Sequence, residues 1–162
     1  MKREKIIIPQ IAHPNLILET LPQICRLKDW QFTSIPKVLW DKNEWDTIYC
    51  EVQAPKFRSS FELQQMPGCC AVLIACFIKP DPYTHDNFDE VLKVIEMASY
   101  EAGFGSLLMA QVVYDDAIWS VCLKRDWIMS DKFVNAKSGN RVVYLTKNLE
   151  QKNKRYELEV QV

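Results

Sequence analysis

An uninterrupted run of ten apolar residues, Cys69–Ile78 (CCAVLIACFI), lies near the middle of the chain. A strand with one solvated face alternates polar and apolar residues, so a continuous run indicates a strand that is covered on both faces. The run is too short to cross a bilayer as a helix, which needs about 20 residues. We therefore predict that it is the central strand of a mixed sheet with helices on both faces.

Apolar residues at helical spacing predict the first helices. The stretch Pro14–Lys28 has such a stripe, and Pro22 within it predicts either a kink or a new helix start. Ser34 is expected to cap a second, short helix that begins at Ser34-Ile-Pro-Lys.

Two later helices are predicted from their end signals. Asn87 with Glu90 three residues later resembles a capping box, with Asp86 as the other candidate cap, and Gly103 is expected to end this helix. A further helix is expected to start at Asp115 or Asp116 and to run to about Arg125.

Strand-like segments bounded by turn residues complete the domain. The further predicted strands are Glu4–Ile8, Trp45–Gln53, Phe57–Gln65, Ser106–Tyr114, Trp127–Asn135 and Asn140–Lys147. The order of elements is then βααβββαβαββ, an α/β (α+β) fold in a single domain over residues 1–149. A helix joins Cys69–Ile78 to Ser106–Tyr114, so these strands are expected to be adjacent and parallel and to diverge at their carboxyl ends.

The end of the chain carries one more strand signal. In Tyr156–Val162 (YELEVQV) the apolar and polar residues alternate. Residues 150–162 are therefore predicted to be a linker and an added edge strand. Seven residues cannot form a stable strand alone, so this strand must pair with an edge of its own sheet or with a second copy, which would make a homodimer.

Composition narrows the function classes. The chain has 162 residues, 48% hydrophobic and 25% charged, with a net charge of −1, so neither a nucleic acid nor a membrane partner is expected. Only three consecutive apolar residues precede Pro9, too few for a signal peptide, so a cytoplasmic location is the default. The six cysteines include no C-x-x-C motif and are expected to be structural thiols, with no metal site.

The C-terminal third resembles a known family. The helix DDAIWSVCLKRDW, followed by a strand and a hairpin that ends in VVYLTKNL, is similar to the N-x-x-A-x-x-x-Y-x-x-x-G-F helix and final strands of the GNAT superfamily of acyl-CoA N-acyltransferases. The order of elements over residues 4–149 also resembles this family. The resemblance implies a GNAT-like fold, acetyl-CoA as cofactor and an amine as substrate.

The chain departs from the family at the cofactor loop. The family's Q/R-x-x-G-x-G/A turn, which cradles a pyrophosphate at a helix N-terminus, is missing here, and residues 80–92 contain no Gly, Lys or Arg. This segment carries four acidic residues instead: Asp81, Asp86, Asp89 and Glu90. We therefore expect acetyl-CoA to bind weakly or not at all. Asp81, His85, Asp86 and Asp89 are also a candidate divalent-ion cluster, although a capped helix start with a solvated acidic loop is the favoured interpretation.

Two functional hypotheses follow. In the first, the chain is a divergent N-acyltransferase: the resemblance implies that backbone groups of Ala75, Cys76, Phe77 and Ile78 hold the pantetheine, with Tyr114 or Cys122 near the leaving sulfur. Glu51 is the candidate base in this hypothesis. In the second, the chain is a non-catalytic GNAT-like protein that binds another macromolecule, since a fold alone does not imply activity. The partner is accordingly either an unknown amine substrate or a protein.

Overall fold

The structure, a computed structural model, describes residues 3–9, 14–38, 45–66, 71–112, 116–134, 136–149 and 155–161. The strands in chain order are β1 (Arg3–Pro9), β2 (Gln31–Val38), β3 (Trp45–Gln53), β4 (Arg58–Met66), β5 (Ala71–Asp81), β6 (Ser106–Val112), β7 (Ile128–Val134), β8 (Arg141–Asn148) and β9 (Arg155–Gln161). The helices are α1 (Pro14–Leu27), α2 (His85–Glu101) and α3 (Asp116–Lys124). Among these described helices, none is long and apolar enough to cross a membrane.

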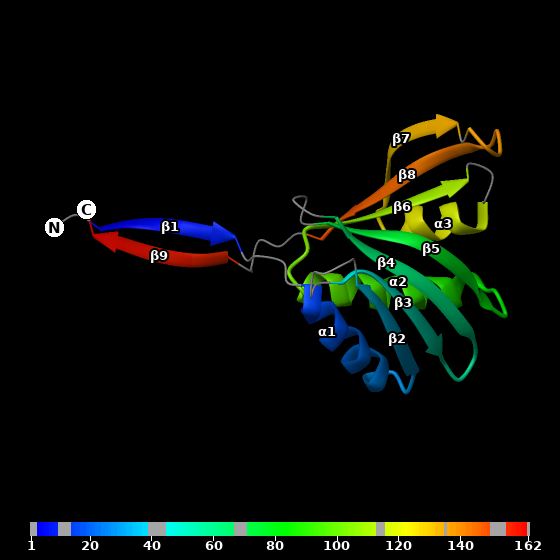
Figure 1. Ribbon diagram of the computed structural model, residues 1–162, viewed down its shortest axis with the longest axis horizontal. Helices are drawn as coiled ribbons and strands as arrows, with labels where there is room; N and C mark the ends of the chain where they lie inside the picture. Colours follow the sequence, from blue (N-terminus) through cyan, green and yellow to red (C-terminus); the bar gives the residue numbers. More distant parts are fainter. Residues whose placement is uncertain are drawn as a thin grey trace.

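The strands form two separate sheets (Figure 1). Seven strands make one mixed sheet in the order β2-β3-β4-β5-β6-β8-β7, and β1 with β9 makes a second, antiparallel sheet. The central strand β5 pairs in parallel with β6 and antiparallel with β4. The predicted parallel pair at the centre of the sheet is therefore confirmed.

One face of the large sheet forms the core. Alternate residues of its central strands are buried in a single apolar cluster with α1, α2 and α3, and these strand residues include Cys50, Phe61, Ile74, Met109 and Leu145. The residues between them, such as Glu51, Ala75 and Ala110, are exposed. All described helices thus cover the same face, whereas helices had been predicted on both faces.

The turns that follow α1 and α3 have the same hydrogen-bonded geometry. α1 and α3 both finish with a residue in the left-handed region, Asp29 at φ 57° and Asp126 at φ 64°. The next residue, Trp30 or Trp127, donates its backbone N–H to a cysteine carbonyl five residues earlier, at 2.8 and 3.0 Å. Asp tolerates the left-handed backbone better than most residues do, so both turns form without a glycine.

The edge strand β2 corrects one prediction. Ser34 does not cap a helix, because it lies within β2 and pairs with Cys50 of β3. Pro36 favours an extended residue before it, and it is tolerated because β2 is the first strand of the sheet. The order of described elements is consequently βαββββαβαβββ.

The other helices also differ in detail from their predicted limits. α1 runs from Pro14 to Leu27 with Pro22 inside it, so no new helix starts there. The cap of α2 is Thr84, whose side-chain oxygen accepts the backbone N–H of Asn87 at 3.0 Å. Asn87 donates its side-chain N–H to the Pro82 carbonyl at 3.0 Å and is not the cap.

The C-terminal strand exists where it was predicted, but it has a different partner. β9 pairs antiparallel with β1 over its whole length, from Arg155 opposite Pro9 to Gln161 opposite Arg3. It does not extend the seven-stranded sheet. Nothing in the described chain tests the dimer that was offered for this strand.

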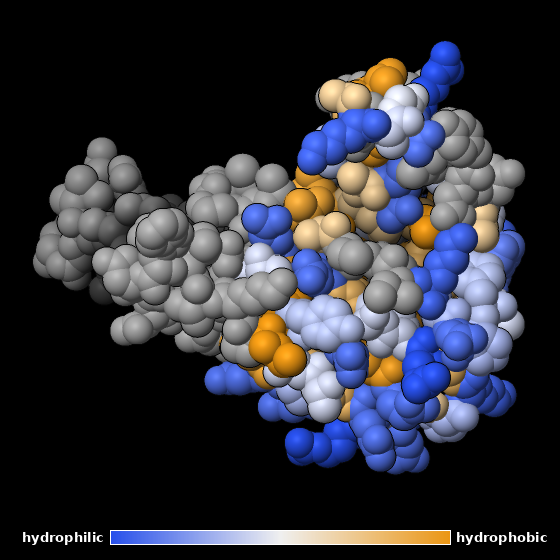
Figure 2. All heavy atoms as spheres, turned by 45° about the vertical axis from the view of Figure 1, so that its right-hand side comes forward, coloured by the Kyte–Doolittle hydropathy of each residue, from blue (hydrophilic) through white to orange (hydrophobic). Residues whose placement is uncertain are grey.

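The edge strand β7, at the end of the large sheet away from β2, carries exposed apolar side chains. Ile128, Phe133 and Val134 of β7 are exposed, and Figure 2 shows hydrophobic side chains on the surface among hydrophilic ones. The Phe133 ring lies 5.3 Å from the ring of Tyr144 on β8. Among the described strands, β7 is the last of the sheet and pairs with β8.

Candidate functional site

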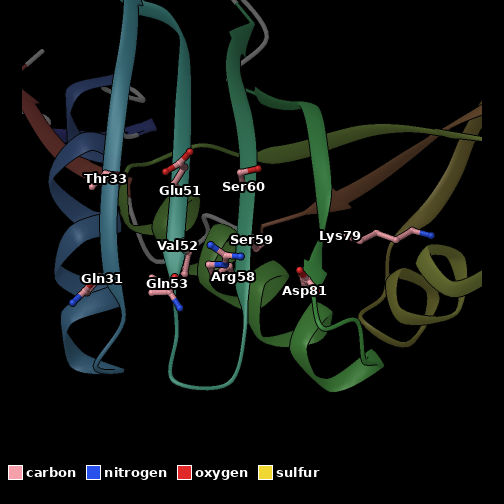
Figure 3. Close-up of a pocket in the computed structure, with 10 residues that line it drawn as sticks. All are labelled: Gln31, Thr33, Glu51, Val52, Gln53, Arg58, Ser59, Ser60, Lys79 and Asp81. Carbon is pink, nitrogen blue, oxygen red and sulfur yellow. The ribbon is translucent and has the colours of Figure 1, made fainter.

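A polar cavity of about 430 Å³ lies on the sheet face opposite the helices (Figure 3). Its walls are rows of residues that the strand register places side by side. The row at the end of the sheet is Gln31, Gln53, Arg58 and Asp81, contributed in turn by β2, β3, β4 and β5. The next row is Thr33, Glu51 and Ser60.

Charges of both signs line this cavity. Arg58 lies between Gln53 and Asp81, and Glu51 is on the neighbouring strand one row away (Figure 3). Glu51 Oε1 accepts a hydrogen bond of 2.9 Å from the Tyr49 hydroxyl, which restricts the carboxylate. Lys79 lines the edge, where its ammonium lies 5.7 Å from the centre of the Tyr83 ring.

The strands next to the cavity separate from each other. β5 and β6 pair only from Ala71–Ser106 to Ile74–Met109, although both strands continue beyond this point. Ala75 is an extra residue opposite β4, because Glu62 pairs with Cys76 and Leu63 with Ile74. Such a bulge bends a strand. The residues predicted to hold a pantetheine, Ala75, Cys76, Phe77 and Ile78, therefore lie where β5 has left the ladder with β6.

The start of α2 differs from a phosphate cradle. Thr84 uses its own side-chain and carbonyl oxygens to accept the N–H groups of Asn87 and Phe88, at 3.0 and 3.1 Å. The first turn also contains Asp86, which is exposed. The Asn87 N–H, one of the first-turn donors that an anion could contact, is thus already used, and a carboxylate stands beside it.

Two of the predicted catalytic residues, Glu51 and Cys122, are not brought together. Glu51 is exposed in the cavity, whereas Cys122 is 0% exposed in the core between the helices and the sheet. Burial, together with the nearby Glu96 and against the opposing effect of Arg125, raises the pKa of the Cys122 thiol to about 12. This placement favours a structural role for Cys122 over the proton transfer that the resemblance implied. Tyr114 lies outside the described residues.

The acidic segment near α2 does not gather around a common point. Asp89 Oδ1 binds Arg125 Nη1 at 3.1 Å, and Asp86 and His85 are exposed in the first turn of α2. No group of three or more potential metal ligands was found within the part of the chain that the structure describes. The capped helix start is therefore the better description of this segment.

Sequence reasoning identified Glu51 but missed its neighbours in the cavity. Arg58 and Ser60 lie in a predicted strand, and Gln31 and Thr33 lie in a strand that was not predicted. The available signal was alternation: Arg58 and Ser60 flank residues of β4 that point into the core. Polar residues at such positions on several strands indicate a polar sheet face.

Comparison with known proteins places this geometry in a fold family. A probable acetyltransferase from Staphylococcus epidermidis ATCC 12228 superimposes with a TM-score of 0.57 at 12% identity, over 91% of this chain and 99% of that protein. An N-acetyltransferase from Staphylococcus aureus Mu50 gives 0.55 at 10% identity, over 92% and 99%. A GNAT family acetyltransferase from Elizabethkingia anophelis, with acetyl-CoA bound, gives 0.54 at 9% identity, over 72% and 97%.

The sequence comparisons give no family. No protein-family model matches the chain, and no curated protein matches its sequence. At 9–12% identity the structural likeness shows the fold alone. The order of elements, the separating parallel strands and these likenesses agree, and the chain has the GNAT acetyltransferase fold.

Proposed function

We propose that the protein is an N-acyltransferase that moves an acetyl group from CoA to an amine. The observation that carries this proposal is the separation of β5 from β6 after Ile74 and Met109. Backbone groups of β5 beyond this point lie outside the ladder with β6. They are suited to bind the amide groups of a pantetheine, whatever the side chains are. The bulge at Ala75 lies at the inner end of this gap.

The chemistry requires a neutral amine and a protonated leaving group. The amine nitrogen attacks the thioester carbonyl carbon, the C–S bond breaks, and the thiolate takes up a proton. Glu51 is the proposed acceptor of the proton that the ammonium loses before attack. Tyr114 is the proposed donor to the thiolate, because the Cys122 thiol is buried.

A second candidate function is supported by the start of α2. The Thr84 side chain occupies the N–H group of Asn87, and the Asp86 carboxylate opposes a diphosphate. A chain that retained the fold but not the cofactor would bind another macromolecule without catalysis.

Isothermal titration with acetyl-CoA and with acetyl-pantetheine separates these candidates. The acyltransferase proposal expects saturable, micromolar or weaker binding of acetyl-CoA, with acetyl-pantetheine nearly as tight, because the pantetheine contacts remain and the diphosphate contacts do not. Absence of saturable binding of both compounds at millimolar concentration supports the non-catalytic candidate.

Turnover variants test the assigned roles. Glu51→Gln and Tyr114→Phe are expected to lower kcat about 10²-fold or more, as for the loss of a general base or acid, while acetyl-CoA binding is unchanged. Glu19→Gln, an exposed position on α1, is the matched control and should leave turnover intact. Equal turnover in all three variants overturns the roles of Glu51 and Tyr114.

A further inference from the structure

The polar cavity has a charge layout that selects among ligands. Its acidic residues are Glu51 and Asp81, and its basic residues are Arg58 and Lys79. Acidic residues alone would favour a cation such as a polyamine, and basic residues alone an anion such as a phosphate, since an unmatched like charge opposes binding. Charges of both signs within one cavity instead match a ligand that itself carries both.

Arg58 is the cation at the centre of the arrangement. It lies in the same row as Gln53 and Asp81, while the Lys79 ammonium points away from it toward the Tyr83 ring (Figure 3). Within the described residues, no carboxylate lies within ion-pair distance of Arg58. A guanidinium binds a carboxylate through two parallel hydrogen bonds, so Arg58 is suited to the carboxylate of a ligand.

Glu51 is the matching anion. It lies on β3, in the row next to that of Arg58, and the hydrogen bond from Tyr49 holds its Oε1. Diagonal neighbours of this kind are roughly 7–8 Å apart at the backbone, a spacing that long side chains reduce. An ammonium at Glu51 and a carboxylate at Arg58 would therefore be neighbouring groups of one small molecule.

The hydrogen-bonding groups define the rest of the ligand. The amides of Gln31 and Gln53 and the hydroxyls of Thr33 and Ser60 complete the lining. These groups both donate and accept, which suits an amide or hydroxyl side chain. A cavity of about 430 Å³ has room for one amino acid.

The bulge of β5 lies beyond the lining of the cavity. From Ser60, two residues along β4, or roughly 7 Å, reach Glu62, which pairs with Cys76 beside Ala75. Glu51 is on β3, two strands or roughly 10 Å from β5, so the Glu51 side chain, the ligand and the acyl group must together span this distance.

We infer that this cavity binds a small zwitterionic amine, an α-amino acid with a polar side chain, with its carboxylate at Arg58 and its ammonium at Glu51. As the acceptor of the acetyl group, this ligand rests on the proposed function; its binding to the cavity does not. The ligand's amine is the group that would be acetylated.

The test is a titration of the full-length protein without CoA, followed by ¹H–¹⁵N NMR. The probes are L-glutamine, L-glutaminamide, which lacks the carboxylate, and N-acetyl-L-glutamine, which lacks the ammonium. We expect saturable shifts at β3 and β4 with L-glutamine and at least tenfold weaker binding of both analogues. Binding of spermidine or L-glutaminamide as tight as that of L-glutamine, or no saturable shift with L-glutamine, overturns the inference.

Variants assign each end of the ligand. Arg58→Gln should abolish the preference for L-glutamine over L-glutaminamide, and Glu51→Gln should abolish the preference over N-acetyl-L-glutamine. Lys56→Gln, an exposed residue in the adjacent turn, is the control that changes charge outside the cavity and should alter neither ratio. Unchanged ratios in the cavity variants, with native spectra, contradict the assignment.

Failure of the amino-acid site and failure of the proposed acetyl transfer give different results. Loss of acetyl-CoA binding with intact binding of L-glutamine removes the transferase reaction and keeps the cavity as an amino-acid site. Acetyl transfer to amines whose KM is unaffected by Arg58→Gln keeps the enzyme and removes the cavity as the acceptor site.

Discussion

The two faces of the large sheet, one covered by the helices and one open, place different requirements on their residues. On β4, Ser59, Phe61 and Leu63 point to the helices and are at most 6% exposed. Arg58 and Ser60, which alternate with them, line the polar cavity. On the face covered by the helices, the requirement is burial, which any side chain of suitable size and polarity can meet. On the open face, the requirement is which charged side chains lie next to one another, and this depends on strand register.

The largest expected effect tests the covered face. Phe61→Ala removes a side chain that is 1% exposed, and we expect it to lower the free energy of unfolding by about 3–5 kcal/mol through lost burial and a cavity. The matched open-face variant, Glu51→Ala, should change it by less than about 1 kcal/mol, as exposed substitutions usually do. Urea unfolding measures both, and similar losses in the two variants would break the comparison.

The buried carboxylate of Glu96 gives a second test of the covered face, because it is a charged group on that side of the sheet. Glu96 is 7% exposed, accepts Arg125 Nε at 2.5 Å and lies 3.4 Å from Lys147 Nζ. Lys147 also donates to the Arg125 carbonyl, so the network ties α2 to the end of α3 and to β8. The ion pairs raise the pKa of Arg125 against the opposing effect of burial.

Glu96→Gln is expected to lower the free energy of unfolding by about 2–4 kcal/mol, because it leaves Arg125 and Lys147 short of a counter-charge. Glu90→Gln is the control. It breaks a more exposed pair, Glu90 Oε2 with Lys28 Nζ at 2.6 Å, and should cost less than about 1 kcal/mol. Equal costs in urea unfolding would mean that burial does not set the strength of these pairs.

The buried strands were the part that sequence could predict. The limits of β3, Trp45–Gln53, were predicted correctly, as was the parallel pairing of β5 with β6. Both depend on apolar runs and alternation, which burial imposes directly. The strand β2 was missed because Ser34 followed by Pro36 satisfies a helix start as well as an edge strand. Only its pairing with β3 decides between them.

The candidate site was predicted only in part, for a related reason. Glu51 was identified, but its association with Arg58 and Asp81 depends on the register of three strands. That register includes two irregularities between β4 and β5, one of them at Ala75. No local pattern predicts where an extra residue enters a strand, so the row of residues that faces a ligand follows from long-range pairing alone.

The thiols on the covered face predict how stability depends on pH. Burial raises the pKa of Cys25 to about 11 and that of Cys122 to about 12, from 9.0. The unfolded chain therefore loses these protons first. This stabilisation is fully present below about pH 9 and is lost as the pH rises through the folded pKa values, by about 1.4 kcal/mol per pH unit for each thiol.

Urea unfolding from about pH 8 to pH 10.5 measures this slope. Cys122→Ala should reduce the slope by one proton, and an unchanged slope would contradict the burial of a titrating thiol.

The smallest expected effect concerns charge at the start of α2. Asp86 is exposed in the first turn of α2, where its carboxylate favours the helix dipole but opposes a diphosphate. Asp86→Asn is expected to tighten acetyl-CoA binding roughly 2–5-fold at low salt, which is the scale of one exposed charge interaction in water. The gain should shrink at high salt, since the screening length falls to about 3 Å at 1 M.

Asp89 is left unchanged in this variant because it binds Arg125, so its replacement would disturb the covered side as well. Glu101→Gln removes the same charge at the other end of α2 and should not alter the affinity. Isothermal titration at two salt concentrations makes the measurement. A gain that persists at 1 M salt, or one that Glu101→Gln reproduces, would show that Asp86 does not act through the local field at the helix start. A submicromolar dissociation constant for the unaltered protein would show that this acidic start does not weaken the cofactor site at all.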